Sequence, residues 1–462
     1  MKYISTRGQA PELTFEEAML TGLARDGGLY LPAEIPVMSH DEIAALAGLP
    51  YEEIAFRVMW PYVSGSFSEQ EFKDIIERAY EGFGHDARAP LKQLNENHFL
   101  LELFHGPTLA FKDFAMQLIG QLFQVALKRR NDRVTIVGAT SGDTGSAAIE
   151  AFRGLDAVDV FILFPHGRVS EVQRRQMTTP ADSNVHALAV DGDFDDCQAA
   201  LKDMFNDFDF RDGVKLAGVN SINFARVLAQ IVYYFSAAVS LGAPHRKVSF
   251  TVPTGNFGDI FAGYLAKRMG LPIDRLVVAT NQNDILHRCL SGEGYFKGDT
   301  IPSISPSMDI QVSSNFERAL YYAYGEDGSA VAQLMDELKS GGFNVSQGAM
   351  EALRESFDSG RVSEDETLAT IKHTLAHSAE LVCPHSAIGI KVGEDHRSTD
   401  VPMITLATAH PAKFPAAVEK ASGEHPPLPS RMSDLYERPE RVTRIANDLG
   451  ALEDHIKGHI AE

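Results

Sequence analysis

The clearest feature of the chain is a rhythm of short apolar runs, each followed by a glycine-containing turn and then by a helical pattern. Three such units have their runs at residues 134–137, 160–164 and 248–252, and 276–279 and 403–407 are further candidates. Runs without polar alternation predict strands buried on both faces, as in a parallel sheet covered by helices. We therefore expect an α/β, doubly wound fold whose ligands bind beyond the carboxyl ends of the strands.

The first part of the chain follows a different pattern, which predicts a helical module over residues 1–85. The sequence Thr14-Phe-Glu-Glu17 is typical of a capping box at a helix start. Further helical patterns cover residues 40–47, 51–62 and 68–82. No group of reactive side chains stands out there, so we expect this module to have a structural role.

We divide the rest into a catalytic α/β core at 86–425, whose smaller subdomain covers about 115–215, and a C-terminal helical tail at 426–462. Within the core, residues 313–375 read as mixed helices with a polar connection around 358–366. The tail ends in a charged helix, which we expect to brace the surface.

The composition excludes several classes of protein. The chain has 462 residues and a net charge of −21, which disfavours nucleic acid and anionic membrane surfaces as partners. The longest uncharged run, 227–244, contains polar side chains and predicts a buried helix rather than a membrane span.

The cysteines and the first residues of the chain indicate where the protein works. The three cysteines, Cys197, Cys289 and Cys383, are widely spaced and form no C-x-x-C pair, which favours a reducing compartment. Because the first residues show no apolar signal region, we expect a cytoplasmic protein.

Lys112 is the leading candidate for covalent chemistry. It stands in the run HGPTLAFKDF, where the only acid close to it in sequence is Asp113. Its apolar neighbours are Phe104, Leu109, Phe111 and Phe114. Apolar surroundings disfavour the ammonium form, so more of the amine is free to form a Schiff base. The alternative is a lysine at a helix start whose amine lies in water, which is the commoner case for a single lysine.

Two glycine-rich turns are candidate anion sites. The turn at 253–259, PTGNFGD, and the turn at 140–145, TSGDTG, each follow an apolar run and precede a helix. Glycines allow backbone N–H groups to face an anion, and the helix dipole adds to the attraction. Neither turn has the lysine of a P-loop or the G-x-G-x-x-G spacing of a dinucleotide site. An ordinary strand-to-helix turn remains the alternative for each turn alone.

Three weaker signals concern anions, a ring nitrogen and metals. Asn220, Ser221 and Arg226 could converge on a phosphate, since arginine offers a fork of donors; the alternative is a helix cap with a surface arginine. Thr408 ends an apolar run, where its hydroxyl could meet a ring nitrogen. Four histidine and cysteine side chains lie close together in sequence, as in a zinc site, but their spacing matches no familiar zinc motif, so we expect no metal. They are His373, His377, Cys383 and His385.

Taken together, these segments closely resemble the threonine synthase family, in its longer bacterial and fungal branch. The matching motifs occur in order along nearly the whole chain: HGPTLAFKDF, ATSGDTGSAA, VNSINFAR, VPTGNFGD and ATAHPAKF. The resemblance implies the architecture of fold type II pyridoxal-phosphate enzymes, which is shared with the tryptophan synthase β-subunit. It thus implies two doubly wound α/β domains behind a helical N-terminal module.

The resemblance also implies roles for individual residues. Lys112 matches the lysine that holds pyridoxal 5'-phosphate as a Schiff base, and Thr408 matches the hydroxyl that faces the pyridine nitrogen. The residues implied for the cofactor phosphate are Gly255, Asn256, Phe257, Gly258 and Asp259. Those implied for the substrate carboxylate are Thr140, Ser141, Asp143 and Thr144, although many relatives carry Asn in place of Asp143. Those implied for the substrate phosphate are Asn220, Ser221 and Arg226.

The implied reaction converts O-phospho-L-homoserine and water to L-threonine and phosphate, in a monomer or homodimer. Two alternatives stay open. A serine or threonine dehydratase on the same fold is disfavoured because its substrates carry no phosphate for Arg226. A non-catalytic phosphoester-binding homologue would be expected to have lost Lys112 or the turn at 253–259. A nucleotide-dependent dehydrogenase or kinase is disfavoured as well, because this sequence lacks the glycine pattern of such enzymes.

Overall fold

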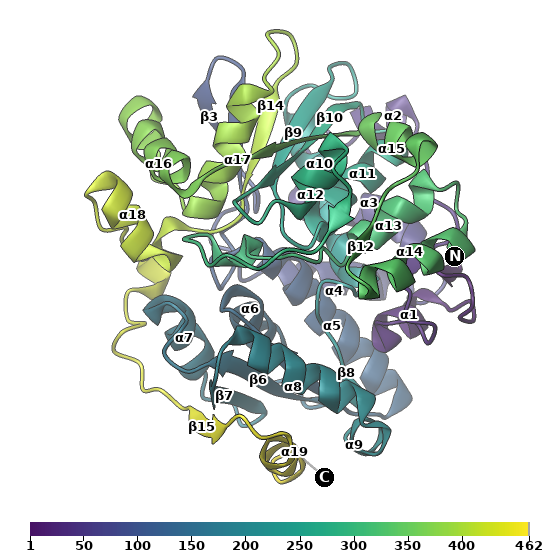
Figure 1. Cartoon of the computed structure of the whole chain (residues 1–462), viewed down its shortest axis with the longest axis vertical. Coiled ribbons are helices and arrows are strands. Elements are labelled where there is room, and N and C mark those ends of the chain that lie inside the picture. The colour runs from purple at the N-terminus through teal and green to yellow at the C-terminus, as the bar shows by residue number, and fades with distance from the viewer. Residues whose placement is uncertain (461–462) are drawn as a thin grey trace.

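The computed structural model describes residues 1–460 and has two lobes, each built around its own sheet (Figure 1). The larger lobe holds a six-stranded sheet of order β13-β10-β9-β14-β4-β3. Its strands pair in parallel, except that β3 runs antiparallel to β4. In sheet order the strands are β13 Phe357–Arg361, β10 Ile273–Thr280, β9 Val248–Pro253, β14 Met403–Ala407, β4 His98–Glu102 and β3 Leu91–Asn95.

The smaller lobe holds a five-stranded parallel sheet of order β15-β7-β6-β5-β8. In that order the strands are β15 Thr443–Ala446, β7 Val185–Asp191, β6 Val158–Pro165, β5 Val134–Ala139 and β8 Leu216–Ala217. All residues of β6 and of β9 are buried, because helices cover both faces of each sheet. The doubly wound α/β architecture expected from the apolar runs is confirmed.

The helices sort with the two lobes. Those of the smaller lobe are α5 Lys112–Arg130, α6 Asp143–Phe152, α7 Glu171–Thr178, α8 Phe194–Asn206, α9 Phe208–Gly213 and α19 Leu449–Lys457. The larger lobe contains α10 Phe224–Ser240, α11 Gly258–Arg268, α12 Ile285–Ser291, α13 Phe316–Ala323, α14 Gly328–Lys339, α15 Gln347–Arg354, α16 Glu364–Ser378, α17 Pro384–Asp395 and α18 Pro415–Ser422. Shorter pieces are β11 Tyr295–Phe296, β12 Gly342–Phe343, η1 Pro306–Met308, η2 Pro411–Lys413 and η3 Ser430–Met432.

The N-terminal module is helical, as expected, and it adds a small two-stranded sheet. Its elements are β1 Tyr3–Ser5, α1 Phe15–Thr21, β2 Tyr30–Pro32, α2 His40–Ala44, α3 Tyr51–Val63 and α4 Glu69–Tyr80. The capping box at Thr14 is present, with Glu17 closing it. Helices α3 and α4 pack against α10 and α5, so the module lies behind both lobes and shares their core.

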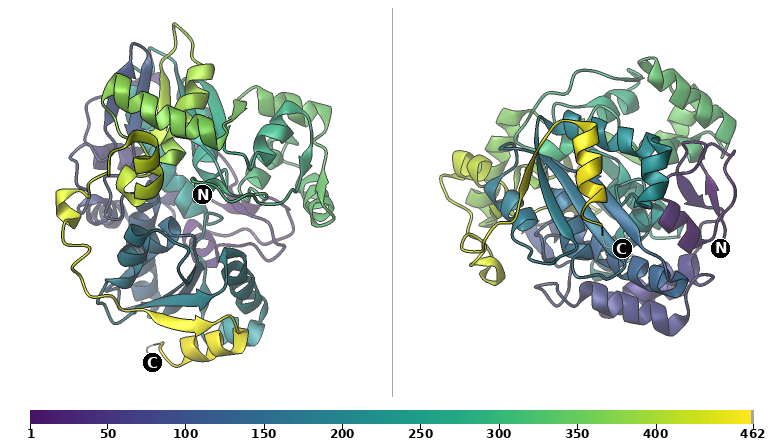
Figure 2. Two further views of the ribbon diagram at one scale, coloured as in Figure 1. Left: turned by 60° about the vertical axis from the view of Figure 1, so that its left-hand side comes forward. Right: turned by 90° about the horizontal axis from the view of Figure 1, so that it is seen from below.

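The tail crosses to the smaller lobe and ends there as a brace (Figure 2). Strand β15 pairs in parallel with β7, and α19 packs on α8. The charged helix was expected, whereas β15 was not, because this edge strand is mostly exposed and leaves no apolar run. The boundaries at residues 85 and 425 stay predictions.

Two further expectations concern single segments. The run 227–244 forms most of α10, whose residues are almost all buried. Within residues 1–460, no helix is long and apolar enough to cross a membrane. The polar connection expected around 358–366 is wrong in part, since β13 is an edge strand there. Of its residues only Phe357 is buried, so alternation gave no signal.

Candidate active site

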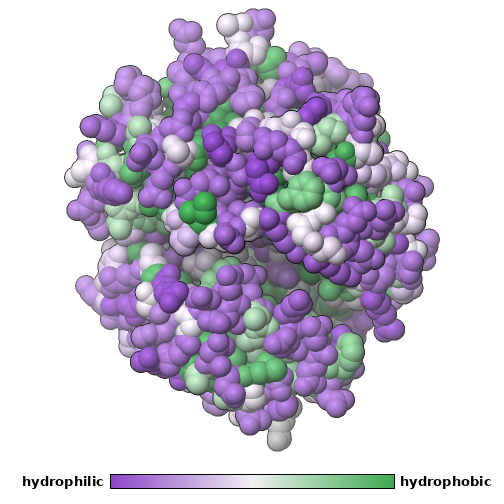
Figure 3. Space-filling model, in the orientation of Figure 1, coloured by the Kyte–Doolittle hydropathy of each residue, from purple (hydrophilic) through white to green (hydrophobic). Residues whose placement is uncertain are grey.

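The sequence-predicted site residues gather at the cleft between the two lobes, which Figure 3 shows as a hollow across the middle of the molecule. The turns after β5 and β9 and the residue after β14 all stand at carboxyl ends of parallel strands. Lys112 begins α5, and the neighbouring Phe111 donates its N–H to the carbonyl of Thr408 at 2.8 Å. The topology therefore brings segments from distant parts of the chain to one place.

Lys112 is 9% exposed, and its Nζ lies 5.0 Å from the centre of the Phe111 ring. The acid that meets it is Asp143, whose Oδ2 is 3.5 Å from Nζ. Burial lowers the pKa of Lys112; Asp143 opposes this shift, and the charges of Arg226 and Lys413 add to it. The amine is therefore more available as a nucleophile than that of an exposed lysine.

Asp113, the acid next to Lys112 in sequence, does not pair with the lysine but accepts hydrogen bonds from the preceding turn. Its carboxylate accepts hydrogen bonds from the N–H and the hydroxyl of Thr108, at 2.8 and 2.6 Å. Burial raises its pKa to about 6, although these hydrogen bonds act in the opposite direction. Asp113 thus fixes the turn that precedes Lys112, and sequence proximity pointed to the wrong acid.

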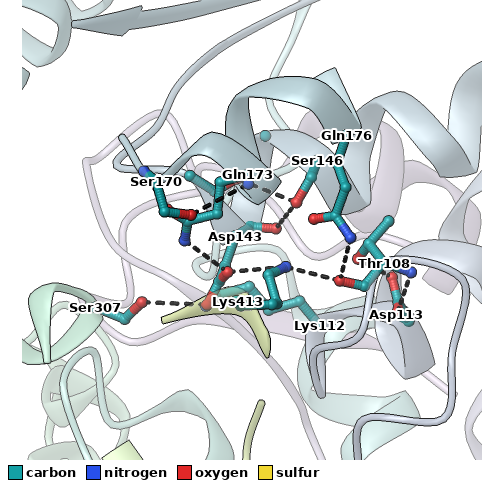
Figure 4. Close-up of polar contacts among 12 residues, drawn as sticks. Thr108, Lys112, Asp113, Asp143, Ser146, Ser170, Gln173, Gln176, Ser307 and Lys413 are labelled. Carbon is teal, nitrogen blue, oxygen red and sulfur yellow. Dashed lines mark hydrogen bonds and ion pairs between the residues drawn. The ribbon is translucent and has the colours of Figure 1, made fainter. Parts of the chain in front are cut away.

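Asp143 is the centre of a buried polar cluster (Figure 4). Its carboxylate pairs with Lys413 Nζ at 2.9 Å and accepts a hydrogen bond from Gln173 Nε2, also at 2.9 Å. The hydroxyl of Ser307 is 3.4 Å from the other oxygen. Burial acts to raise the pKa of Asp143, but Lys413, Lys112 and Gln173 outweigh it and hold the pKa far below its usual value. Asp143 is therefore a carboxylate, and it joins the smaller lobe to the larger.

Lys413 was not expected in the site, although it lies in the ATAHPAKF motif. It is fully buried, and its Nζ also donates to the carbonyl of Thr108 at 2.7 Å. A lysine between Ala412 and Phe414 has the same kind of apolar setting that singled out Lys112. This setting was the signal that could have identified it.

His385, Gln173 and Ser307 were also missed as site residues. The N–H of Ser307 donates to His385 Nε2 at 3.2 Å. Burial lowers the pKa of His385 to about 4, so the imidazole is neutral at pH 7. Gln173 reaches Asp143 because position 142 is glycine; a Cβ on Gly142 would lie 2.3 Å from the Gln173 amide carbon. These contacts join segments far apart in sequence, so spacing alone gave no signal for them.

The turn after β9 forms an anion cradle at the start of α11. From Gly255 to Asp259, successive backbone N–H groups have no hydrogen-bond partner among residues 1–460. Phe257 has φ 63°, a left-handed conformation that helps the N–H groups converge. Unpaired N–H groups at a helix N-terminus are suited to a phosphate. The backbone of this turn therefore has the conformation that a phosphate site requires.

The Asp259 side chain turns away from this role. Its Oδ1 accepts hydrogen bonds from the hydroxyls of Tyr233 and Tyr234, at 2.5 and 3.1 Å. Burial raises the pKa of Asp259 to about 6, and the tyrosines and Lys112 act in the opposite direction. What Asp259 offers to the cradle is its backbone N–H, while its carboxyl group faces the tyrosines of α10.

The turn after β5 is shaped by Thr140, whose hydroxyl accepts from the N–H groups of Gly142 and Gly145, both at 2.9 Å. In the described part of the chain, the side chains and the N–H groups of Ser141 and Thr144 have no hydrogen-bond partner. They are therefore available to an anion next to Lys112. Asp143 belongs to this turn, but its carboxylate faces the lysines.

Arg226 is 4% exposed, and its guanidinium has no ion pair or hydrogen bond among the residues that the structure describes. Burial lowers its pKa to about 10, so it stays a cation at pH 7. A buried cation without a counter-ion is costly unless an anion binds there. Asn220 is exposed, and the Ser221 hydroxyl lies 3.5 Å from that of Ser314. The three residues share one segment, and among them Arg226 is the buried cation suited to bind an anion.

Thr408 is 6% exposed, and its hydroxyl makes no hydrogen bond within residues 1–460. The four candidate zinc ligands do not form a site. His373 and His377 stack on each other in α16, whereas Cys383 and His385 are buried, and the described residues contain no metal-binding group of three or more.

The arrangement fits pyridoxal 5'-phosphate. Lys112 is a buried amine with a lowered pKa, which suits the aldehyde. The N–H groups of the turn after β9 suit the phosphate, and the free hydroxyl of Thr408 suits a ring nitrogen. The unpaired Arg226 guanidinium leaves a second cation for the phosphate of a substrate.

Comparison with known proteins agrees with this geometry. Three family models match the chain: "Threonine synthase N terminus" over residues 2–80, "Pyridoxal-phosphate dependent enzyme" over 85–333, and "Threonine synthase, C-terminal" over 386–456. The threonine synthase of Pseudomonas aeruginosa is 57% identical, with 99% of this chain and 98% of that protein covered.

Solved structures give the same result. The PLP-bound threonine synthase from Brucella melitensis superposes with a TM-score of 0.97 at 56% identity, covering 99% of each chain. Yeast threonine synthase superposes with a TM-score of 0.93 at 40% identity, covering 99% of this chain and 98% of that one.

Proposed function

The chain belongs to the threonine synthase family of pyridoxal-phosphate-dependent lyases, and from this premise we propose that it converts O-phospho-L-homoserine and water to L-threonine and phosphate. The observation that carries the choice of substrate is the buried, unpaired guanidinium of Arg226 close enough to influence Lys112. A phosphorylated amino acid supplies the anion that this cation lacks.

Lys112 has two tasks in this proposal. It would hold the cofactor through the aldehyde, and its amine would serve as the base that removes protons from the substrate carbons. Bound pyridoxal phosphate supplies the electron sink that makes such protons acidic. Burial lowers the pKa of Lys112 and so increases the unprotonated share of the amine relative to an exposed lysine.

The anion sites orient the substrate around that amine. Ser141 and Thr144 offer unpaired hydroxyl and N–H groups to the substrate carboxylate. Arg226 binds the substrate's phosphate and stabilises the charge that develops on it as it leaves. Asn220 and Ser221 complete this phosphate site at its open side.

Thr408 and Asp143 act on the cofactor side. A neutral hydroxyl next to the ring nitrogen leaves that nitrogen unprotonated and limits how strongly the ring withdraws electrons. Asp143 balances the charges of Lys112 and Lys413. We also propose a cytoplasmic monomer or homodimer; the three cysteines are buried and free, which suits a reducing compartment.

The test is phosphate release by the purified holoenzyme supplied with O-phospho-L-homoserine, with threonine measured in parallel. We expect equimolar phosphate and threonine, and no deamination of serine. Arg226→Ala should lower kcat/KM for this substrate by about 100-fold or more, because a charged phosphate contact is lost. Deamination of serine without phosphate release would point to a dehydratase instead, and an unchanged kcat/KM in Arg226→Ala would refute the role of Arg226.

A further inference from the structure

The segment that carries the phosphate-site residues connects the two lobes. It leaves β8 of the smaller sheet at Ala217 and enters α10 of the larger lobe at Phe224. Between these elements, residues 218–223 form an irregular turn, which we call the phosphate turn. Arg226 follows in the first turn of α10, so the position of its guanidinium depends on how this backbone is held.

The hydrogen bonds that fix the phosphate turn come mainly from the N-terminal module and from α13. The Asn223 side chain caps α10 through Oδ1 and donates from Nδ2 to the carbonyl of Met19 at 2.8 Å. Arg318 donates from Nη2 to the carbonyl of Ile222 at 2.6 Å. Within residues 1–460, the remaining side-chain hydrogen bond of the turn is the long one between Ser221 and Ser314. The phosphate turn is therefore connected to the N-terminal module in two ways. Asn223 bonds to Met19 directly, and Arg318 bonds to both Ile222 and Tyr30.

Arg318 is a junction between three parts of the molecule. It is fully buried in α13 and donates twice to the carbonyl of Tyr30, at 3.2 and 3.0 Å. Its Nη1 also donates to the side chain of Asn315, whose own N–H donates to the carbonyl of Asn256 in the cofactor cradle at 3.0 Å. One guanidinium thus links the N-terminal module, the phosphate turn and the cradle.

The chemistry of these contacts indicates positioning rather than charge pairing. All of the acceptors are neutral oxygens, and no carboxylate pairs with Arg318 in the described part of the chain. Burying an uncompensated guanidinium is costly, and an apolar side chain would fill the space at less cost. A planar fork of five donors, however, fixes several carbonyl groups in set directions, which lysine cannot do.

We propose that Arg318 and Asn223 are positioning residues, which use the N-terminal module as a support to hold the phosphate turn so that Arg226 meets the substrate's phosphate. The inference rests on the proposed phosphate-binding role of Arg226. It gives the module, which has no reactive group of its own, a part in substrate recognition. Met19 and Tyr30 contribute only their carbonyl groups to this contact, which every residue type has, so the role could not be predicted from the sequence.

The test uses two variants of the holoenzyme and inorganic phosphate as the probe. Arg318→Lys keeps the charge and loses the fork. Asn223→Ser keeps an N-cap and loses the reach to Met19, so it serves even if Arg318→Lys does not fold. We expect calorimetric affinity for phosphate to fall about tenfold in each, with KM for O-phospho-L-homoserine rising similarly. We expect kcat to fall as well, because Arg226 also stabilises the leaving phosphate. The absorption of the bound cofactor should change little in Asn223→Ser, whose side-chain hydrogen bonds do not reach the cradle.

The matched control is Arg7→Met. Arg7 joins the same module to the same helix through Glu317, at 3.0 Å, but does not touch the phosphate turn. If positioning is specific, Arg7→Met keeps its phosphate affinity within about twofold, since it shares no partner with the turn. Equal losses in Arg7→Met and Arg318→Lys would overturn the proposal, because general docking of the module would then explain them.

Arg226→Ala separates this inference from the proposed function. If Arg226→Ala loses phosphate affinity while Arg318→Lys and Asn223→Ser keep it, the positioning role is wrong and the phosphate site stands. If Arg226→Ala itself keeps full phosphate affinity, the proposed function of Arg226 fails, and the inference that rests on it fails as well.

Discussion

The turns that begin α6 and α11 are alike in sequence and opposite in chemistry. Each follows a buried parallel strand, contains glycines and places an aspartate in the first turn of the helix. Asp143 is held as a carboxylate by two lysines, whereas the pKa of Asp259 is raised to about 6 by burial among tyrosines. The charge of Lys112 lowers the pKa of both carboxyl groups, but only Asp143 pairs with its amine.

The comparison teaches that a glycine-rich turn predicts an anion site only through its backbone. Each turn has some unpaired N–H groups, those of Gly255 to Asp259 in one and those of Ser141 and Thr144 in the other, yet each also carries an aspartate whose charge would oppose an anion. The contradiction disappears in three dimensions, because each carboxyl group faces partners outside its own turn. Lys413 neutralises one, and the hydroxyls of Tyr233 and Tyr234 satisfy the other.

The largest expected effect comes from Asp143→Asn. The change leaves Lys413 buried without a counter-ion, which typically costs about 3–5 kcal/mol of stability. We expect kcat/KM to fall by about 100-fold or more, because Lys112 and Lys413 then repel each other across the site. Urea unfolding and phosphate-release kinetics measure the two effects. A variant with wild-type stability would show that the Asp143–Lys413 pair is not structurally important.

Lys413→Met should act on the pH dependence. Without this cation, Asp143 faces Lys112 alone and raises its pKa, so a higher pH is needed for the same fraction of free amine. The acid limb of the kcat profile therefore moves to higher pH. Lys413→Arg keeps the charge and should leave the limb close to its wild-type position. If the limb moves equally in both variants, packing rather than charge is responsible.

Asp259→Asn should have the smallest effect on catalysis, within about fivefold, because the amide oxygen still accepts from the tyrosines. Its effect on stability depends on pH. A folded-state pKa of about 6, raised above the unfolded value, gives stability that is present below about pH 4 and is lost as the pH rises through about 6. Because asparagine does not titrate, the variant should gain stability relative to the wild type as the pH rises from about 4 to about 6, and the difference should level off above that. A constant difference in the free energy of unfolding would contradict the raised pKa.

The sequence allowed the strand, turn and helix units to be predicted because buried parallel strands leave continuous apolar runs. It also pointed to Lys112, Arg226 and the two turns as candidate site residues, whose roles stay predictions. It could not give the partners of Asp143, since Gln173, Ser307 and Lys413 come from three separate elements. The strands β13 and β15 could not be predicted either, because edge strands are largely exposed and need few apolar residues. Contacts made through backbone carbonyl groups, such as those of Tyr30 and Met19, leave no trace in a sequence.

Lys112, and not the more deeply buried Lys413, is the lysine that we expect to hold the cofactor. Borohydride reduction of the freshly purified yellow protein, followed by peptide mass spectrometry, tests it directly. We expect one pyridoxyl group on the peptide that contains Lys112, and none on the peptide that contains Lys413. A pyridoxyl group on Lys413, or an unmodified Lys112 in protein whose colour has been bleached, would contradict the account.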